Sequence, residues 1–282
     1  METFFTFLEK RVADSSSLLC VGLDPHISDL KEATAEAAFD FCAGLIQRTA
    51  PYAAAFKPNA AFFEQFDAAG WTALKRVIDA VREQSQRLGS MIPVIFDAKR
   101  GDIASTAEAY ARSAFQTLGA HAITLSPYLG RDSIDPFLTD PEKGAFLLCK
   151  TSNPGAGDLQ DLQVVGTEHD SRPGEPLYIA VARLAQSWNV KNNIGLVVGA
   201  TQPGAMARVR AAAPDLWFLA PGIGAQGGEL EAALKSGLRR DGKGLLLPVS
   251  RAISRAADPG KAAAALRDEI INIQYRLTNT SR

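Results

Sequence analysis

The sequence predicts a (β/α)8 barrel, and three features of the chain lead to that prediction. Short apolar segments alternate with helical segments, and this pair repeats eight times. The apolar segments are continuous, as in parallel strands that are buried on both faces. No glycine-rich fingerprint follows the first of them, which disfavours the alternative, an open doubly wound sheet. Eight strand–helix units are enough to close a barrel.

The first half of the chain is expected to supply an opening helix and four of these units. An amphipathic pattern covers residues 4–13, before the first strand. The strands are expected at 18–23, 52–56, 91–96 and 122–125, and the helices that follow them at 33–49, 71–87, 106–118 and 134–138.

The second half continues the alternation but contains one long connection. The strands are expected at 145–149, 194–198, 216–219 and 245–248, and the helices at 176–188, 203–212, 229–235 and 259–275. Residues 153–175, after strand five, are rich in Gly, Pro, Asp and Gln. Loops of this length often act as lids, although a surface insertion without a role fits equally well. We expect residues 1–282 to form a single barrel domain that carries this loop.

Composition excludes several classes of partner. The formal net charge is -1, so neither nucleic acid nor an anionic membrane is expected to bind. Cys20, Cys42 and Cys149 are widely spaced and lack CxxC spacing, which indicates free thiols in a reducing compartment. The first residues do not form a signal peptide, and no apolar run reaches the ~18 residues of a membrane helix. A cytoplasmic protein is therefore expected.

Charged residues gather where the predicted strands end. Asp97 and Lys99 are two residues apart, so they share one face of strand three, and Asp102 follows closely. A structural ion pair that caps the strand is the alternative interpretation. In a barrel the carboxyl ends of all strands share one rim, where active sites of this fold lie. The same position on other strands adds Asp24, Lys57, Ser152 and Arg251.

The last two strands end in residues that suit a phosphate group. A glycine-rich turn, residues 221–228, follows strand seven, and Arg251 follows strand eight. This is the usual phosphate position of the fold, where backbone N–H groups favour an anion. Glycines alone are a weak signal because tight turns need them. Together with Arg251 they predict a phosphorylated substrate.

Five short motifs occur together between Asp24 and Arg251. They are Leu23-Asp24-Pro25, Phe56-Lys57-Pro58, Asp97-x-Lys99-x-x-Asp102-Ile-x-x-Thr106, Pro221-Gly-x-Gly-Ala-Gln-Gly-Gly and Ser250-Arg251. Together they resemble the orotidine 5′-phosphate decarboxylase family, in its longer bacterial form. The resemblance implies conversion of orotidine 5′-monophosphate to UMP and CO2 in de novo pyrimidine biosynthesis, without a metal or an organic cofactor. It also implies a homodimer with shared active sites.

The resemblance further implies a role for each matching residue. Lys99 would protonate C6 of the pyrimidine as CO2 leaves, and Asp97 would lie near the substrate carboxylate. Asp102 and Thr106 would reach into the neighbouring subunit's site. The remaining contacts would be Asp24 and Lys57 to the ribose hydroxyls and the charge network, Ser152 to the pyrimidine edge, Gln226 to base and phosphate, Arg251 to phosphate, and Pro221, Gly222 and Gly227 in the substrate-binding turn.

Other barrel enzymes remain as alternatives. A sugar-phosphate decarboxylase or a hexulose-phosphate aldolase shares the Asp-x-Lys pair, but it holds Mg²⁺ with an acid where Lys57 stands. A Schiff-base aldolase would need a lysine of lowered pKa, whereas carboxylates flank Lys99. A non-catalytic nucleotide-binding barrel would be expected to have lost a charged rim residue. His26 is close enough to Asp24 to reach the site, whereas His121 is expected to be a packing residue.

Overall fold

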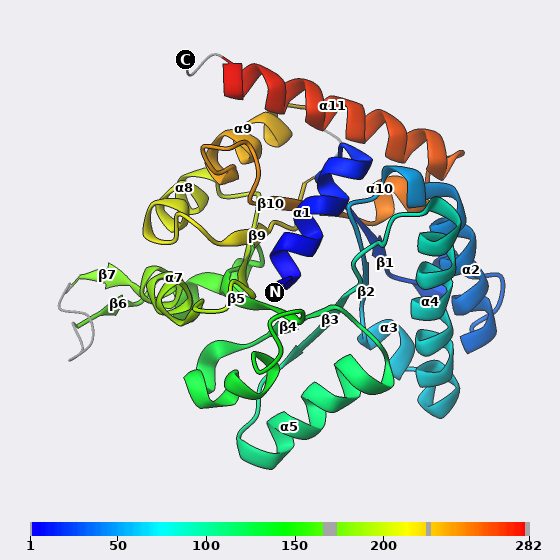
Figure 1. Cartoon of the computed structure of the whole chain (residues 1–282), viewed down its shortest axis with the longest axis horizontal. Helices are drawn as coiled ribbons and strands as arrows, with labels where there is room; N and C mark the ends of the chain where they lie inside the picture. The colour runs from blue at the N-terminus through cyan, green and yellow to red at the C-terminus, as the bar shows by residue number, and fades with distance from the viewer. Residues whose placement is uncertain (1, 166–173, 224–226, 280–282) are drawn as a thin grey trace.

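The strands close into a barrel, as predicted. The computed structural model describes residues 2–165, 174–223 and 227–279. Eight parallel strands lie in the order β2-β1-β10-β9-β8-β5-β4-β3, and bridges Phe56–Val94 and Asn59–Asp97 join β2 to β3 (Figure 1). The strands are β1 (Leu19–Leu23), β2 (Ala55–Pro58), β3 (Ile95–Arg100), β4 (Ala122–Leu125), β5 (Gly144–Lys150), β8 (Ile194–Val198), β9 (Trp217–Leu219) and β10 (Leu245–Val249).

Helices surround the strands (Figure 1). Those with a predicted counterpart are α1 (Phe4–Ser15), α2 (Ala35–Thr49), α4 (Asp67–Leu88), α5 (Ala104–Arg112), α7 (Leu177–Trp188), α8 (Pro203–Ala212), α9 (Gly227–Gly237) and α11 (Pro259–Asn279). Two four-residue helices, α3 (Ala61–Glu64) and α10 (Arg251–Ser254), were not predicted because they are too short to show a period. A 3-10 turn, η6 (Asp135–Phe137), replaces the helix expected at 134–138, and two more 3-10 turns, η4 (Pro127–Leu129) and η5 (Arg131–Ser133), precede it. Within the described ranges, no helix is both long and apolar enough to cross a bilayer.

Two strands begin later than the apolar pattern suggested. The strand expected at 91–96 is β3, which starts at Ile95 and includes Asp97 and Lys99. Likewise β2 starts at Ala55 and includes Lys57. Both strands also end later than predicted, and the predicted ends were wrong because each was placed just before the first charged residue. Here the charged residues lie inside the strands, where they pair with one another.

The helix α1 closes the amino end of the barrel. The helix lies across one end of the barrel (Figure 1). Its Phe5 ring stacks on Trp217 with centroids 6.1 Å apart, and it meets Phe146 edge-on at 5.7 Å. Phe4 and Phe5 are fully buried. Arg11 is also buried and donates to the carbonyl of Ala53 at 3.0 Å. The opposite, carboxyl end of the barrel is thereby left as the open one.

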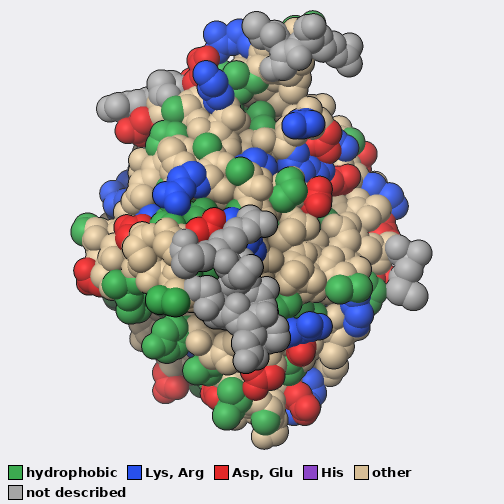
Figure 2. Space-filling model, turned by 90° about the vertical axis from the view of Figure 1, so that its left-hand side faces the viewer, with side chains coloured by type: hydrophobic (Ala, Val, Ile, Leu, Met, Phe, Trp, Pro, Cys, Tyr) green, Lys and Arg blue, Asp and Glu red, His purple; other side chains and the backbone are tan. Residues whose placement is uncertain are grey.

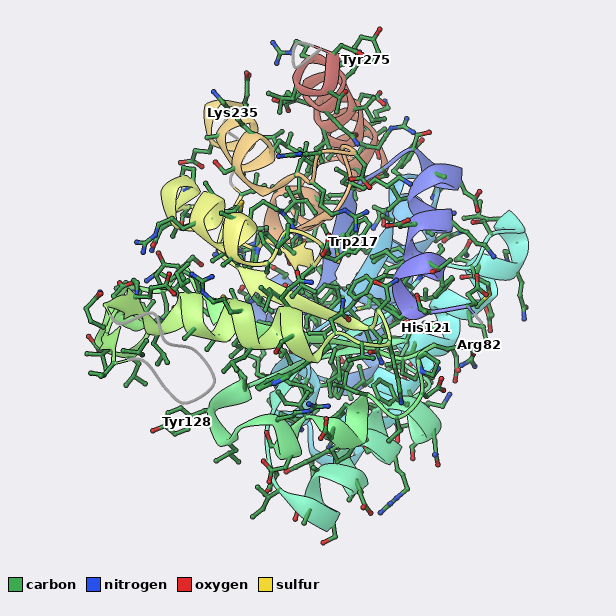
Figure 3. All side chains as sticks on the ribbon, turned by 60° about the vertical axis from the view of Figure 1, so that its left-hand side comes forward. Arg82, His121, Tyr128, Trp217, Lys235 and Tyr275 are labelled. Carbon is green, nitrogen blue, oxygen red and sulfur yellow. The ribbon has the colours of Figure 1, made fainter. Side chains whose placement is uncertain are left out.

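His121 packs at the same amino end, just before β4. Its Nδ1 accepts a hydrogen bond from the backbone N–H of Val94 at 3.1 Å, and its ring contacts Phe7. Burial lowers the pKa of His121 to about 4, and the positive charges of Lys143 and Arg82 act in the same direction (Figure 3). The imidazole is therefore neutral in the folded protein at neutral pH.

This neutral histidine predicts an acid-sensitive step in stability. An unfolded chain takes up the proton near pH 6.5, whereas the folded chain resists it down to about pH 4. Stability should therefore fall as the pH is lowered through that window. His121→Asn keeps an acceptor for Val94 but removes the titrating ring, so its melting temperature should vary less between pH 6.5 and 4. A variant as pH-sensitive as the parent protein would contradict this account.

The long connection after β5 contains several small elements. It contains the 3-10 turn η7 (Pro154–Ala156), α6 (Gly157–Gln160) and an antiparallel ribbon of β6 (Gln163–Val164) and β7 (Glu175–Pro176). Residues 166–173 lie outside the described residues. The ribbon projects beside α7 (Figure 1), and side chains of both charges are mixed on this face (Figure 2). Action as a lid stays a prediction.

All three cysteines are buried and free, as expected. Burial raises the pKa of the Cys20 thiol to about 12. The pKa of Cys42 and that of Cys149 are raised by the same cause. A thiol that stays protonated is a poor nucleophile, so the cysteines act as packing residues.

Candidate active site

The centre of the candidate site is a carboxylate held between two ammonium groups. Asp97, on β3, accepts hydrogen bonds from Lys57 Nζ at 2.7 Å and from Lys99 Nζ at 2.6 Å. The hydroxyl of Thr124 on β4 donates to the same carboxylate at 2.9 Å. Asp97 and Lys57 are buried, whereas the Lys99 side chain is 50% exposed. Lys99 is thus the member of this charged cluster that is most open to a ligand.

The buried members of the cluster stay charged at neutral pH. Burial alone would raise the pKa of Asp97, but the positive charges of Lys57 and Lys99, with their hydrogen bonds, hold it well below its usual range. Burial would also lower the pKa of Lys57, but the negative charges of Asp97 and Asp24 raise it above its ordinary value. The site therefore presents fixed charges in a water-poor setting, where electrostatic stabilisation is strongest.

The strand that carries these residues is irregular. After Phe96, the pairing of β3 with β4 shifts register. Lys99 has φ +47°, a left-handed conformation that costs a non-glycine residue about 1–2 kcal/mol. The Thr124 hydroxyl accepts hydrogen bonds from the backbone N–H groups of Ala98 and Lys99, at 3.1 and 3.0 Å. Thr124 therefore fixes both the bent backbone under Lys99 and the carboxylate of Asp97.

The turn after β3 requires a glycine. A side-chain carbon on Gly101 would lie 2.9 Å from the carbonyl oxygen of Ser126. Ser126 is itself tied to β3, because its N–H donates to the carbonyl of Arg100 at 2.8 Å. Arg100 in turn pairs with Glu64 on α3 at 2.5 Å. These contacts fix the backbone that leads from the charged cluster to Asp102.

A cavity of about 570 Å³ opens beside Lys57 at the carboxyl ends of β1, β2, β9 and β10. Within the described part of the chain, two of its buried polar atoms, Asp24 Oδ1 and Ser250 Oγ, have no hydrogen-bond partner. Buried polar atoms are normally paired, so these two are available to a ligand. The cavity is lined by Gly22, Asp24, His26, Lys57, Phe62, Pro221, Gly222, Ile223, Pro248, Val249, Ser250, Arg251 and Ala252.

One wall of the cavity is aromatic. The rings of His26 and Phe62 meet edge-on with centroids 4.4 Å apart. His26 therefore reaches the site, as its position after Asp24 suggested. Phe62 lies on α3, the short helix that the sequence pattern did not reveal.

The glycine-rich turn brings Ser152 to the same end of the barrel. A side-chain carbon on Gly222 would lie 3.6 Å from Ser152 Oγ, and one on Gly199 would lie 3.0 Å from Ser152 Cβ. Gly222 has φ +101°, which favours glycine. Gln226 lies outside the described residues, and Gly227 begins α9. Ser152, the predicted pyrimidine contact, thus lies next to Gly222 of the predicted substrate-binding turn.

Several predicted site residues do not line the cavity: Asp97, Lys99 and Ser152, which lie next to it, and also Asp102 and Thr106. Asp102 is half-buried, and its Oδ1 accepts a hydrogen bond from the N–H of Ile103 at 2.8 Å. Thr106 is exposed on α5. Neither residue is among those that line the cavity. Large exposed apolar side chains occur in the same part of the sequence and just after β4, namely Ile103 and Tyr128.

Comparison with known proteins identifies the family. The family model described as "Orotidine 5'-phosphate decarboxylase / HUMPS family" matches residues 17–266. The chain belongs to this family. It is 49% identical over 268 residues to orotidine 5'-phosphate decarboxylase of Roseiflexus castenholzii, which covers 94% of this chain and 93% of that one. The carboxy-lyase predicted from the sequence motifs is confirmed at this level.

Solved structures of the orotidine 5'-phosphate decarboxylase / HUMPS family agree with the fold. The Leishmania donovani OMP decarboxylase superposes with a TM-score of 0.85 and 53% identity, covering 97% of this chain and 99% of that one. The Leishmania donovani UMP synthase superposes with a TM-score of 0.86 and 55% identity, covering 98% of this chain but 57% of its own. The barrel therefore corresponds to one part of that longer protein.

Three residues of the site were not predicted from the sequence. Thr124 was read as part of an apolar strand, although a lone hydroxyl in such a strand is a usable signal. Phe62 belongs to a helix too short to predict. Ser250 was noted only as the neighbour of Arg251, and nothing in the sequence showed that its hydroxyl is buried beside Asp24.

Proposed function

We propose that this chain converts orotidine 5′-monophosphate to UMP and CO2 in de novo pyrimidine biosynthesis, with Lys99 protonating C6. The observation that carries the proposal is the buried carboxylate of Asp97 between Lys57 and Lys99, next to a cavity that also contains Arg251. The family description also covers HUMPS members. Lys57 favours the decarboxylase, since its ammonium would repel a metal ion at the end of β2.

The charged cluster suits the chemistry of this decarboxylation. When the C6–carboxyl bond breaks, its electron pair stays on C6 in the plane of the ring, where no adjacent π system accepts it. A cation must therefore already be in place. Lys99 Nζ stabilises the developing charge and then transfers its proton to C6. Asp97 orients Lys99. Its negative charge also lies beside the substrate carboxylate, and the repulsion between the two favours the departure of CO2.

The remaining residues bind the rest of the nucleotide. Asp24 and Lys57 hold the ribose hydroxyls, and the unpartnered Asp24 Oδ1 supports this role. Ser152 meets the pyrimidine edge. The phosphate binds Arg251 beside the glycine-rich turn, which supplies Pro221, Gly222, Gln226 and Gly227. The phosphate is remote from C6, but its binding energy can drive closure of loops around the reacting atoms.

The proposed reaction uses no metal and no organic cofactor. Turnover of orotidine 5′-monophosphate, followed by ultraviolet absorbance, should be the same with and without EDTA. The reason is that Lys57 and Lys99 supply the positive charge that Mg²⁺ supplies in the enolate-forming relatives. Loss of activity in EDTA that Mg²⁺ restores would overturn the proposal.

Arg251→Ala should impair only the phosphorylated substrate. Loss of a charge-assisted contact to phosphate should raise KM for orotidine 5′-monophosphate about 100-fold. Decarboxylation of orotidine, which lacks the phosphate, should stay almost unchanged. Arg255→Ala is the matched control, because Arg255 pairs with Asp29 at 3.1 Å and does not line the cavity. Equal losses with both substrates would show that Arg251 is structural.

The same proposal includes a homodimer whose active sites are shared. Asp102 and Thr106 would complete the site of the neighbouring subunit. One observation supports this: exposed apolar side chains, Ile103 and Tyr128, are available for an interface near these residues. We further propose a single-domain, cytoplasmic protein, since its buried free thiols suit a reducing compartment.

A further inference from the structure

The amide of Gln160 is bonded at both ends to one residue beside the active site. Its Oε1 accepts a hydrogen bond from the backbone N–H of Thr151 at 2.9 Å. Its Nε2 donates to the Thr151 hydroxyl at 2.8 Å. That hydroxyl donates onward to Asn153 Oδ1 at 2.6 Å. Gln160 therefore fixes the backbone and the side chain of the residue that immediately precedes Ser152.

The next residue, Asp161, binds the side chain of Lys150, which immediately precedes Thr151. Lys150, the last residue of β5, is 2% exposed, and its Nζ donates to Asp161 Oδ1 at 2.7 Å. The Lys150 ammonium also lies 5.3 Å from the ring centre of Tyr178. A buried ammonium that loses its charged partner is strongly destabilised. The pairs Thr151–Gln160 and Lys150–Asp161, here called the β5 clamp, thus anchor the long connection at two adjacent points.

The β5 clamp acts on the backbone that carries Ser152. On the other side of that backbone lies Gly199, the residue after β8, whose N–H donates to the carbonyl of Lys150 at 2.7 Å. A side-chain carbon on Gly199 would lie 3.0 Å from both the backbone nitrogen and the Cβ of Ser152. Ser152 is therefore confined between the end of β8 and the clamp, with its hydroxyl near Gly222.

We propose that Gln160 and Asp161 are positioning residues for Ser152, and that they set the geometry in which the pyrimidine edge is bound. This inference rests on the proposed function. The side chains of Gln160 and Asp161 are engaged with Thr151 and Lys150, so both act through the β5 clamp and not by contact with substrate. The long connection after β5 thereby has a role in substrate recognition that is independent of any closure over the ligand.

A double-mutant cycle between Gln160 and Ser152 tests the inference. Gln160→Met keeps the size of the side chain and removes both bonds to Thr151, so kcat/KM for orotidine 5′-monophosphate should fall about tenfold. Gln160→Glu keeps an acceptor for the Thr151 N–H and should recover part of this loss. Ser152→Ala should lower kcat/KM by itself, and adding Gln160→Met to it should have little further effect.

The control variant is Gln163→Met, in the same connection. Gln163 is exposed and bonds only weakly to the carbonyl of Asp161, at 3.3 Å, so its loss should leave kcat/KM within about twofold of the parent enzyme. Melting temperatures are measured for every variant. If Gln160→Met does not fold, Thr151→Val takes its place in the cycle, since it removes the hydroxyl that Gln160 and Asn153 share.

The outcomes separate this inference from the function on which it rests. Losses from Gln160→Met and Ser152→Ala that multiply in the double variant would overturn the positioning role, and so would a Gln160→Met enzyme that matches Gln163→Met. In both cases the parent enzyme still turns over orotidine 5′-monophosphate and the proposed function stands. A parent enzyme without that activity would overturn both.

Discussion

Lys99→Ala is expected to lower turnover of orotidine 5′-monophosphate by about 10⁴-fold or more, while the protein stays folded and still binds UMP. The substitution removes the proposed proton donor and the charge that stabilises the carbanion. The fold should survive, because Asp97 keeps its bonds to Lys57 at 2.7 Å and to Thr124 at 2.9 Å. Single-turnover absorbance measures the chemical step, and calorimetric titration with UMP measures binding.

Two comparisons sharpen this prediction. Lys57→Ala should destabilise the protein by about 3–5 kcal/mol, because it strips a buried carboxylate of its buried partner. Lys261→Ala, at a lysine whose side chain is 88% exposed, should change neither stability nor turnover. A Lys99→Ala enzyme that retains a tenth of the parent activity would rule out Lys99 as the proton donor.

Mixed dimers of two inactive variants should regain activity. Asp102→Asn and Lys99→Ala homodimers should each be nearly inactive, since every site lacks one group. In a heterodimer with shared sites, one site carries both lesions and the other carries neither. Activity should therefore approach about half of the parent value per heterodimer, if the two sites act independently. The measurement is turnover by a heterodimer purified with two different affinity tags.

Subunit exchange must be shown in the same preparation. Mixing Lys99→Ala with a second Lys99→Ala chain that carries the other tag is the matched control, and it should stay inactive. A verified heterodimer of Asp102→Asn and Lys99→Ala that stays inactive would place Asp102 in its own subunit's site and contradict the shared-site proposal.

The charged cluster was predictable where the information is local. Asp97 and Lys99 are adjacent on one strand face, so the period of a β-strand is enough to bring them together. Lys57, the other partner of Asp97, lies 40 residues earlier in the chain, and the sequence alone does not show that the two side chains meet. The same limit explains the misplaced end of β3, because a charged side chain inside a buried strand can be predicted only when its partner is known.

Other features of the site depend on packing that leaves no pattern in the sequence. The register shift after Phe96 and the bond from Thr124 to Asp97 were not predicted, because they arise from the match between two strands. The ribbon β6–β7 has strands of two residues, too short for any periodicity. The position of Asp102 in the neighbouring subunit's site was predicted from the family resemblance alone, because no sequence pattern assigns a side chain to the site of one subunit or the other.

The packing of α1 against late parts of the chain affects the order of events during folding. The helix is made before its partners, because Phe5 packs on Phe146 of β5 and Trp217 of β9, and Glu9 pairs with Arg239 beyond β9 at 2.7 Å. Trp217 and Arg239 are separated from α1 by more than half of the chain, and Phe146 by about half. Contacts of such long range form late, because the intervening chain must be ordered first. During synthesis on the ribosome, the apolar face of α1 therefore stays exposed until β9 has emerged, which makes the nascent chain a client for chaperones that bind hydrophobic helices.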